Sequence, residues 1–478
     1  MKIILQNHDE KYAVQEIVNE YFPKIKLCFS SSIPENENYI FSEYSHTKNS
    51  HIYYAKCSVD GINTEHSVSS DEYNKTNLKK CISACLSDIT GIHLPWGVLT
   101  GIRPSKIVRE YVYCGKTYEN AYELLNGFYE ADESKCRLAV NVEKNESNLI
   151  KNMYDDGISL YIGIPFCPTR CLYCSFTSQS IHFSNKLTQP YVEALKREIN
   201  EVSKLEYIRK RRIETVYFGG GTPSALTREQ IEDILSSLFH NFDLSNVKEI
   251  TFEAGRPDTI TRDKLEVLKK FNISRISINP QTSNDKTLEI IGRKHTYSDF
   301  EDSLALARDL GFSHINCDII AGLPDETEMD FQKTLDSLIL HNPESITVHT
   351  MSIKHGSFLD MRYDMYSLST AKTVDNMLNS AFKTISATGM IPYYMYRQKN
   401  MIGNLENIGY CKPGHECLYN IYIMEEVQSI IALGAGGSTK IVSDESIKRV
   451  FNVKEVSEYI NRIDEMIERK RNLLDLYI

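Results

Sequence analysis

The sequence has no run of about 20 apolar residues, which is the length that a membrane-spanning helix requires. The apolar stretch at its start, Met1–Leu5, is soon followed by charged residues and does not fit a signal peptide. Apolar residues still make up 41% of the 478 residues, which is enough for a large core. These features predict a soluble protein of the cytoplasm that does not contact a membrane.

Positive charge is also scarce in this chain. Lysine and arginine total 54 against 64 aspartates and glutamates, so the formal net charge is −10. This balance argues against nucleic-acid binding, because a phosphate backbone attracts basic surfaces. Tryptophan occurs once and tyrosine 29 times, a bias that by itself indicates no function.

Twelve cysteines in a long chain without a signal peptide do not fit a secreted disulfide scaffold. Nine of them are scattered, and we expect them to be small buried hydrophobic residues. They are Cys28, Cys57, Cys81, Cys85, Cys114, Cys136, Cys317, Cys411 and Cys417. The other three lie within eight residues and need a chemical explanation.

Residues 1–150 are typical of a small α/β domain, whose role the sequence does not indicate. The predicted elements are strands at Met1–Leu5 and His51–Val59, helices at His8–Tyr21 and Ser70–Ile89, loops at Ser30–Asn38 and Tyr44–Asn49, and a polar helical linker at Lys144–Asp156. The fold class is therefore α/β from the first residues onward.

In residues 151–355, short apolar runs alternate with amphipathic helical segments. The predicted strands are Ser159–Ile164, Glu214–Phe218, Glu249–Glu253, Arg275–Ile278, Asn316–Ile320 and Ser345–His349. The predicted helices, which continue past 355, are Tyr191–Leu205, Arg228–Phe239, Arg262–Phe271, Tyr297–Leu310, Glu328–His341 and Thr370–Ala387. This alternation implies parallel strands with right-handed crossovers, as a partial (β/α) barrel or a doubly wound sheet. Residues 356–478 are expected to form an irregular C-terminal extension that closes the open side.

Cys167, Cys171 and Cys174 follow the first of these strands with the spacing C-x3-C-x2-C. Three neighbouring thiolates suit a soft metal site, either zinc or an iron–sulfur cluster. Structural zinc requires a fourth ligand close by, and the next histidine, His182, is eight residues further on. A cluster with three cysteine ligands instead leaves one iron open to a small-molecule chelate. We therefore predict a [4Fe–4S] cluster.

The surrounding motifs resemble those of radical S-adenosylmethionine (SAM) enzymes, in particular the oxygen-independent coproporphyrinogen III oxidase (coproporphyrinogen dehydrogenase) family. The similar segments are Tyr161-x-x-Ile-Pro-Phe-Cys167, Phe218-Gly-Gly-Gly-Thr-Pro223, Ser277-x-x-x-Gln281, Ile291-Gly-Arg293 and Asp318-x-x-x-Gly-Leu-Pro324. The N-terminal domain, with Leu99-Thr-Gly-Ile-Arg-Pro104 and Tyr396-Arg-Gln-Lys-Asn400, is similar to the long HemZ-type subgroup. The resemblance implies a partial (β/α)6 barrel.

The resemblance also implies roles for single residues. Gly220, Gly221, Thr222 and Glu253 would contact SAM, with Tyr161 near its methionine and Phe176 near its adenine. Gln281, Arg293 and Asp318 would surround a second SAM molecule or position the substrate. Arg103, Arg397 and Lys399 are candidate partners for the propionates of a tetrapyrrole.

The implied reaction is the oxidative decarboxylation of two propionates of coproporphyrinogen III to vinyl groups, which gives protoporphyrinogen IX in haem biosynthesis. One or two SAM molecules and an electron donor such as flavodoxin or ferredoxin would serve a monomeric oxidoreductase. The best-known oxidases carry a fourth cysteine two residues after the third, where this chain has Phe176. That C-x-F step also resembles a haem-chaperone branch and a haem-degrading methyltransferase branch.

Two alternatives follow from these observations. In a haem carrier, His349, His355 or His415 would be candidate axial ligands, although a structural histidine is the commoner case. In an RNA-modifying radical SAM enzyme, the N-terminal domain would bind RNA, which the acidic balance disfavours.

Overall fold

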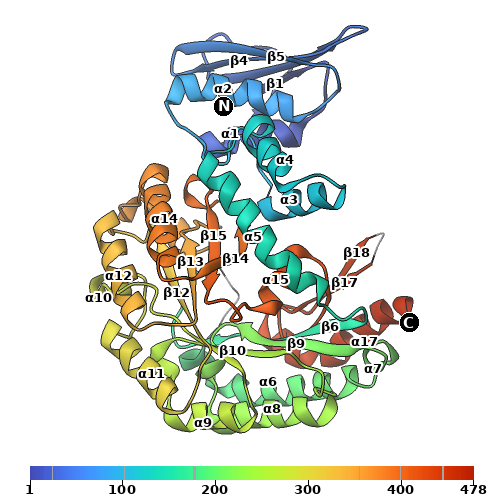
Figure 1. Ribbon diagram of the computed structural model, residues 1–478, viewed down its shortest axis with the longest axis vertical. Coiled ribbons are helices and arrows are strands. Elements are labelled where there is room, and N and C mark those ends of the chain that lie inside the picture. The colour runs from blue at the N-terminus through green and yellow to red at the C-terminus, as the bar shows by residue number, and fades with distance from the viewer. Residues whose placement is uncertain (24, 102, 176–178, 355, 399, 444–445) are drawn as a thin grey trace. The chain divides into compact units, whose positions relative to one another are not determined.

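The computed structural model describes the chain except for residues 24, 102, 176–178, 355, 399 and 444–445, and it leaves out the side chains of 182–184 and 363. The chain divides into two compact units (Figure 1). One contains residues 1–140 with 403–405, and the other contains residues 141–402 with 406–478. No helix in the described part of the chain is long and apolar enough to cross a membrane.

The N-terminal unit is built on a five-stranded sheet in the order β2-β1-β3-β4-β5. The strands are β1 (Lys2–Gln6), β2 (Cys28–Phe29), β3 (Tyr39–His46), β4 (His51–Val59) and β5 (Ile62–Ser70). Helices α1 (Lys11–Tyr21) and α2 (Thr76–Thr90) share one core with this sheet. On α2, Leu78, Cys81, Ile82 and Cys85 are fully buried at the spacing of a single apolar helix face.

The prediction of a loop at Tyr44–Asn49 is wrong at its start, because β3 continues to His46. Strand β5 has no counterpart among the predicted elements. It lies at the edge of the sheet and consists mainly of polar residues, so its apolar alternation is weak. The segment predicted as a linker begins inside the long helix α5 (Glu133–Lys151). The helices before α5 are α3 (Pro104–Tyr113), α4 (Tyr118–Glu123) and the π-helical turn η1 (Leu124–Phe128).

The second unit contains an eleven-stranded sheet in the order β14-β15-β13-β12-β11-β10-β9-β6-β16-β17-β18. The six predicted strands are confirmed as parallel neighbours in chain order. They are β6 (Gly157–Ile164), β9 (Arg212–Gly220), β10 (Glu249–Gly255), β11 (Arg275–Ile278), β12 (Ile315–Ala321) and β13 (Ser345–Thr350). This is the arrangement of a partial (β/α)6 barrel.

The crossover helices lie along the outside of the curved sheet (Figure 1). They are α6 (Ile181–Val202), α8 (Arg228–Asn241), α9 (Arg262–Lys270), α11 (Tyr297–Asp309), α12 (Glu328–Leu340) and α14 (Ala371–Ser386). The connections also contain the short helices α7 (Glu206–Arg209), α10 (Asp285–Ile290) and α13 (Phe358–Met361). Helices α8, α11 and α12 each begin with a threonine capping box, which satisfies their first backbone N–H groups. Such caps explain why their starts agree closely with the sequence prediction.

The C-terminal region extends the same sheet at both edges. Strands β14 (Ile391–Arg397) and β15 (Glu406–Cys411) continue it beyond β13, with antiparallel pairing. Strand β16 (Ser429–Leu433) lies parallel to β6, and β17 (Ser438–Val442) and β18 (Ile447–Phe451) follow as antiparallel partners. The remaining helices are α15 (Leu418–Glu425), α16 (Val456–Asn461) and α17 (Ile463–Leu474). The C-terminal extension is thus part of the sheet.

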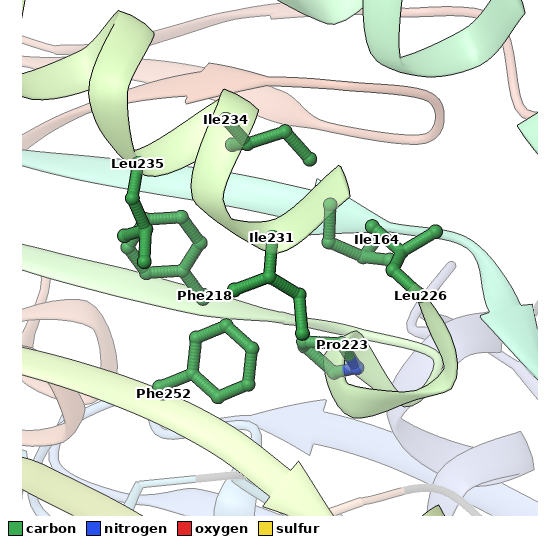
Figure 2. A pocket seen from close by; sticks show the side chains of 8 residues that line it. All are labelled: Ile164, Phe218, Pro223, Leu226, Ile231, Ile234, Leu235 and Phe252. Carbon is green, nitrogen blue, oxygen red and sulfur yellow. The ribbon is translucent and has the colours of Figure 1, made fainter. Parts of the chain in front are cut away.

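A small apolar cavity of about 10 Å³ lies between the sheet and α8 (Figure 2). Ile231, Ile234 and Leu235 of α8 face Phe218 and Phe252 of the sheet across it. The cavity is barely large enough for one water molecule, and its lining residues offer no polar partner for one. It is a packing void of the core and lies apart from the polar residues described next.

Candidate active site

The three clustered cysteines lie on the loop that leaves β6. Cys167 belongs to the short strand β7 (Phe166–Cys167), which pairs with β8 (Gln179–Ser180). The backbone N–H of Cys174 donates to the carbonyl of Cys171 at 3.1 Å, which closes a tight turn between these two thiols. Cys171 is buried, and Cys167 and Cys174 are half-buried. We call residues 167–174 the cysteine loop.

Three other loops hold the cysteine loop through hydrogen bonds. After β11, the carbonyl of Ile291 accepts from the N–H of Leu172 at 3.0 Å, and the carbonyl of Gly292 accepts from the Thr169 hydroxyl at 2.7 Å. After β13, the carbonyl of Gly356 accepts from the guanidinium of Arg170 at 2.9 Å. The loop is therefore positioned by the carboxyl ends of neighbouring strands, where barrel enzymes place their active sites.

After β10, Arg256 makes a third attachment. Its Nη1 donates to the carbonyl of Thr169 at 3.2 Å and to the hydroxyl of the same residue at 2.7 Å. Arg256 is not among the residues that the sequence motifs predict. A cation in a turn gives no signal in a single sequence that it will contact a loop 87 residues away.

The glycine motif after β9 packs directly against the cysteine loop. The N–H of Gly221 donates to the carbonyl of Ile164, and the N–H of Thr222 donates to the carbonyl of Phe166, both at 2.7 Å. A Cβ atom on Gly221 would lie 2.5 Å from that carbonyl of Phe166, so only glycine fits there. The Thr222 hydroxyl lies 3.5 Å from Cys167 Sγ as a hydrogen-bond donor. The structure thus brings these predicted residues to the first cysteine.

Gly220 has a φ of +108°, a conformation that residues with side chains rarely adopt. A Cβ atom added to Gly220 would lie 3.3 Å from the hydroxyl of Tyr161. The Tyr161 ring stacks with Tyr217 and Tyr419, at centroid distances of 6.3 and 6.2 Å. These rings belong to a larger set of tyrosines on the inner side of the sheet, which includes Tyr393, Tyr394, Tyr396 and Tyr422. Seven of the 29 tyrosines therefore lie in this one cluster.

Glu253 on β10 accepts a hydrogen bond from the Tyr217 hydroxyl. Burial raises the pKa of the Glu253 carboxyl to about 7, and the nearby Asp318 carboxylate adds to this shift, although the Tyr217 hydrogen bond opposes it. Near neutral pH this carboxyl therefore exists in both protonation states. A carboxyl with such a pKa on the inner side of a barrel is typical of a ligand site.

Asp318 on β12 lies on the same inner side. Its Oδ1 accepts from the Asn316 amide at 2.7 Å, and its Oδ2 lies 3.7 Å from His349 Nε2. Burial tends to raise the pKa of Asp318, but His349 and the hydrogen bonds from Asn316 and Thr347 outweigh it, and the net pKa is lowered. The carboxylate is therefore charged at neutral pH and is ready to accept hydrogen bonds.

Gln281 and Arg293 complete the set of predicted polar residues. Gln281 has a positive φ of 67° and is buried; its N–H donates to the Asp318 carbonyl, which places it beside β12. The Arg293 guanidinium donates to the carbonyl of Asn279 at 2.9 Å and to the Tyr173 hydroxyl at 3.4 Å. Its Nε is buried and makes no hydrogen bond within the described residues. In that part of the chain no carboxylate forms an ion pair with it.

Other predicted residues are not brought into this set. Phe176, His355 and Lys399 lie outside the described residues. Arg103 belongs to the N-terminal unit. His415 contacts His314, whose carbonyl accepts from the N–H of Ile276 near the amino end of β11, at the opposite end of the strands.

The chain matches known proteins over most of its length. Residues 161–338 match the model of the radical SAM superfamily. The oxygen-independent coproporphyrinogen-III oxidase-like protein HemZ of Bacillus subtilis is 35% identical over 98% of this chain and 96% of its own length. The chain belongs to the HemZ branch of the radical SAM superfamily.

More distant relatives carry a different name. The heme chaperone HemW of Escherichia coli is 27% identical over 59% of this chain and 70% of its own length. The solved structure of Escherichia coli coproporphyrinogen III oxidase, HemN, is 23% identical, with a TM-score of 0.55 over 67% of this chain and 72% of that one. The HemN likeness supports the fold of this HemZ-branch protein.

Radical SAM proteins use a [4Fe–4S] cluster and SAM, and the donor set of the cysteine loop fits such a cluster. Two of the three thiols lie near cations, since Arg293 interacts with Cys171 and Lys354 with Cys174. Nearby cations favour the thiolate form that binds iron. No three potential ligands among the described residues converge on one point, as a single ion would require. A four-iron cluster does not need such convergence, because each thiolate binds a different iron.

Proposed function

We propose that this protein is an oxygen-independent tetrapyrrole oxidase, which converts propionates of coproporphyrinogen III into vinyl groups. Cys167, Cys171 and Cys174 would hold the cluster. When bound, the cluster and SAM supply a 5′-deoxyadenosyl radical that removes a hydrogen atom from a substrate carbon. The resulting substrate radical would lose CO₂ and give up one electron to a one-electron acceptor such as an oxidised flavodoxin or ferredoxin, which leaves the vinyl group.

The observation that carries this proposal is the half-buried side chain of Arg293, whose Nε is fully buried. A buried charge is normally paired, and a guanidinium binds a carboxylate through parallel hydrogen bonds. Its Nε has no hydrogen-bond partner among the described residues, and its Nη2 contacts a tyrosine of the cysteine loop. A carboxylate bound here, from SAM or from a substrate propionate, would lie next to the radical source.

The carboxylates on the inner side of the sheet supply acceptors for the rest of the ligand. Asp318 is charged at neutral pH and suits the hydroxyls of a ribose. Glu253, when ionised, suits the ammonium of SAM. Gly220 and Gly221 present backbone without a side chain, so a ligand can approach the chain closely. Glu253 and Asp318 thereby orient the reacting groups, which is the main task of the protein in cofactor chemistry.

Haem carriage is the second candidate, because the HemW relatives are named haem chaperones and the C-x-F step lacks the fourth cysteine. Two of its candidate axial ligands find protein partners. His349 lies 3.7 Å from Asp318, and the His415 ring lies against His314 near the amino ends of the strands. These placements favour the oxidase over the carrier.

The deciding experiment is anaerobic reconstitution with iron and sulfide, followed by SAM, dithionite and coproporphyrinogen III. We expect vinyl products and 5′-deoxyadenosine by chromatography, with two SAM consumed for each protoporphyrinogen IX, and neither in Cys171→Ala. Haem bound at one per chain without SAM cleavage would support the carrier. SAM cleavage that leaves coproporphyrinogen unchanged would point to another substrate and contradict the proposal.

A further inference from the structure

The turn after β10 contains one residue more than the neighbouring strand requires. The register between β10 and β11 shifts between Phe252 and Gly255, and Gly255 has a φ of +68°. The bulge directs the next side chain, Arg256, toward the cysteine loop. The backbone there is fixed, because the carbonyl of Arg256 accepts hydrogen bonds from both the N–H and the hydroxyl of Thr259.

The side chain of Arg256 is 3% exposed, and its guanidinium donates hydrogen bonds from both edges. Nε and Nη2 donate to the two carboxylate oxygens of Asp258 at 2.9 and 2.8 Å, which is a bidentate ion pair. Nη1 reaches the carbonyl and the hydroxyl of Thr169, at the centre of the segment between Cys167 and Cys171. The cation therefore lies between one carboxylate and the cysteine loop.

Asp258 also lies near a histidine. His295 Nδ1 is 3.9 Å from Asp258 Oδ1, and its side chain is fully buried, with no hydrogen-bond partner for either ring nitrogen among the described residues. Burial and the neighbouring Arg293 lower the pKa of His295 to about 4, so this ring is neutral at pH 7. The charges next to Thr169 are those of Arg256 and Asp258, whereas the cations Arg293 and Lys354 lie near Cys171 and Cys174.

We propose that Arg256 is a positioning residue of the cluster, which fixes the cysteine loop through Thr169 and sets the reduction potential with its buried charge. The potential of an iron–sulfur cluster depends on nearby charge, hydrogen bonding and solvent exposure. Reduction adds an electron, so a buried cation favours the reduced form. The Arg256 guanidinium stabilises that form, and the Asp258 carboxylate moderates the effect.

The test is a redox titration of the reconstituted cluster without SAM or substrate. The amount of reduced cluster is measured from its electron paramagnetic resonance signal. In Arg256→Gln the ratio of reduced to oxidised cluster at a fixed potential should fall about tenfold, a shift of about 59 mV for one electron. Arg256→Lys keeps the charge, so its ratio of reduced to oxidised cluster should stay within about threefold of the wild-type ratio. Asp258→Asn leaves the cation uncompensated and should raise the ratio. A purely structural role does not produce shifts of opposite sign.

Arg212→Gln is the matched control, because Arg212 Nε also donates to an aspartate, Asp156, at 2.6 Å, but at the amino end of β9. It should leave the ratio unchanged. Equal ratios in the wild type, Arg256→Gln and Asp258→Asn, each with four irons per chain, would overturn the inference. If Arg256→Gln does not hold iron, Asp258→Asn decides alone. A wild type that holds no cluster would instead contradict the cofactor assignment on which this inference rests.

Discussion

The two ends of the parallel strands differ in how their charged side chains are partnered. At the amino end of β9, the fully buried Glu214 accepts hydrogen bonds from Lys248, Tyr422, Gln428 and the N–H of Tyr154, at 2.6 to 3.2 Å. Every donor is supplied by the protein. The carboxylate links the sheet to the C-terminal helix α15 and to β16.

At the carboxyl ends of the strands, the charged side chains find only some of their hydrogen-bond partners within the described part of the protein. Glu253 has a pKa raised to about 7, and Arg293 keeps a buried Nε without a hydrogen bond among the described residues. Protein stability favours complete pairing, since an unpaired buried charge costs free energy. The contrast between Glu214 and the pair of Glu253 and Arg293 therefore favours the carboxyl end as the ligand-binding part of the barrel and the amino end as the part that stabilises the fold.

The largest effect that we expect at the carboxyl end is the loss of the cluster in Cys171→Ala. Removal of one thiolate leaves an iron without its protein ligand, so iron content and the broad visible absorbance should fall to background near neutral pH. Cys317→Ala is the matched control, since Cys317 is a buried cysteine of β12 that lies in the core. Full iron content in Cys171→Ala would refute the ligand assignment.

At the amino end, Glu214→Ala should destabilise the fold by about 3–5 kcal/mol, because it leaves the Lys248 ammonium and three other donors without their acceptor. Urea unfolding of the cluster-free protein measures this change. Glu206→Ala, at an exposed ion pair with Lys210, should change the free energy of unfolding by less than about 1 kcal/mol. Equal effects of the two variants would show that the buried Glu214 carboxylate stabilises the fold no more than an exposed ion pair does.

The sequence was sufficient to predict the parallel part of this fold. Local signals decide it: apolar runs for the strands, amphipathic periodicity for the helices, and capping threonines such as Thr227 and Thr327 at the helix starts. The predicted strand His51–Val59 agrees with β4 at both ends. The cysteine spacing likewise predicts the metal loop, because the three expected ligands are close in the sequence.

The rest could not be predicted because it depends on contacts between distant segments. Strand β16 is five residues long, and only its pairing with β6, about 270 residues earlier, makes it part of the sheet. The roles of Arg256 and Tyr217 depend on contacts with Thr169 and Glu253, which lie on other loops and strands. A single sequence carries no signal for such pairs.

The protonation of Glu253 provides a test with a defined sign. Its pKa is about 7 in the folded protein against 4.5 as the ordinary value, so the folded state binds more protons and stability falls as the pH rises between these values. Glu253→Gln should therefore be more stable than the wild type at pH 8, by about 3 kcal/mol at most, and equally stable at pH 4. Thermal unfolding of the cluster-free protein at both pH values measures this difference. A variant that is less stable at pH 8 would show that the carboxylate is satisfied, as Glu214 is.

The smallest effect concerns Asp318, whose carboxylate we expect to accept a hydrogen bond from bound SAM. Asp318→Asn removes the charge and should weaken SAM binding about tenfold, since a hydrogen bond to a charged group contributes about 1.5–3 kcal/mol. Anaerobic calorimetry with the reconstituted protein measures the affinity. Asp309→Asn, at an exposed ion pair with Arg262, should bind SAM as the wild type does. Unchanged affinity in Asp318→Asn would assign this carboxylate to the internal pairing with His349 and Asn316, and the ligand-binding region of the carboxyl end would then narrow to Glu253 and Arg293.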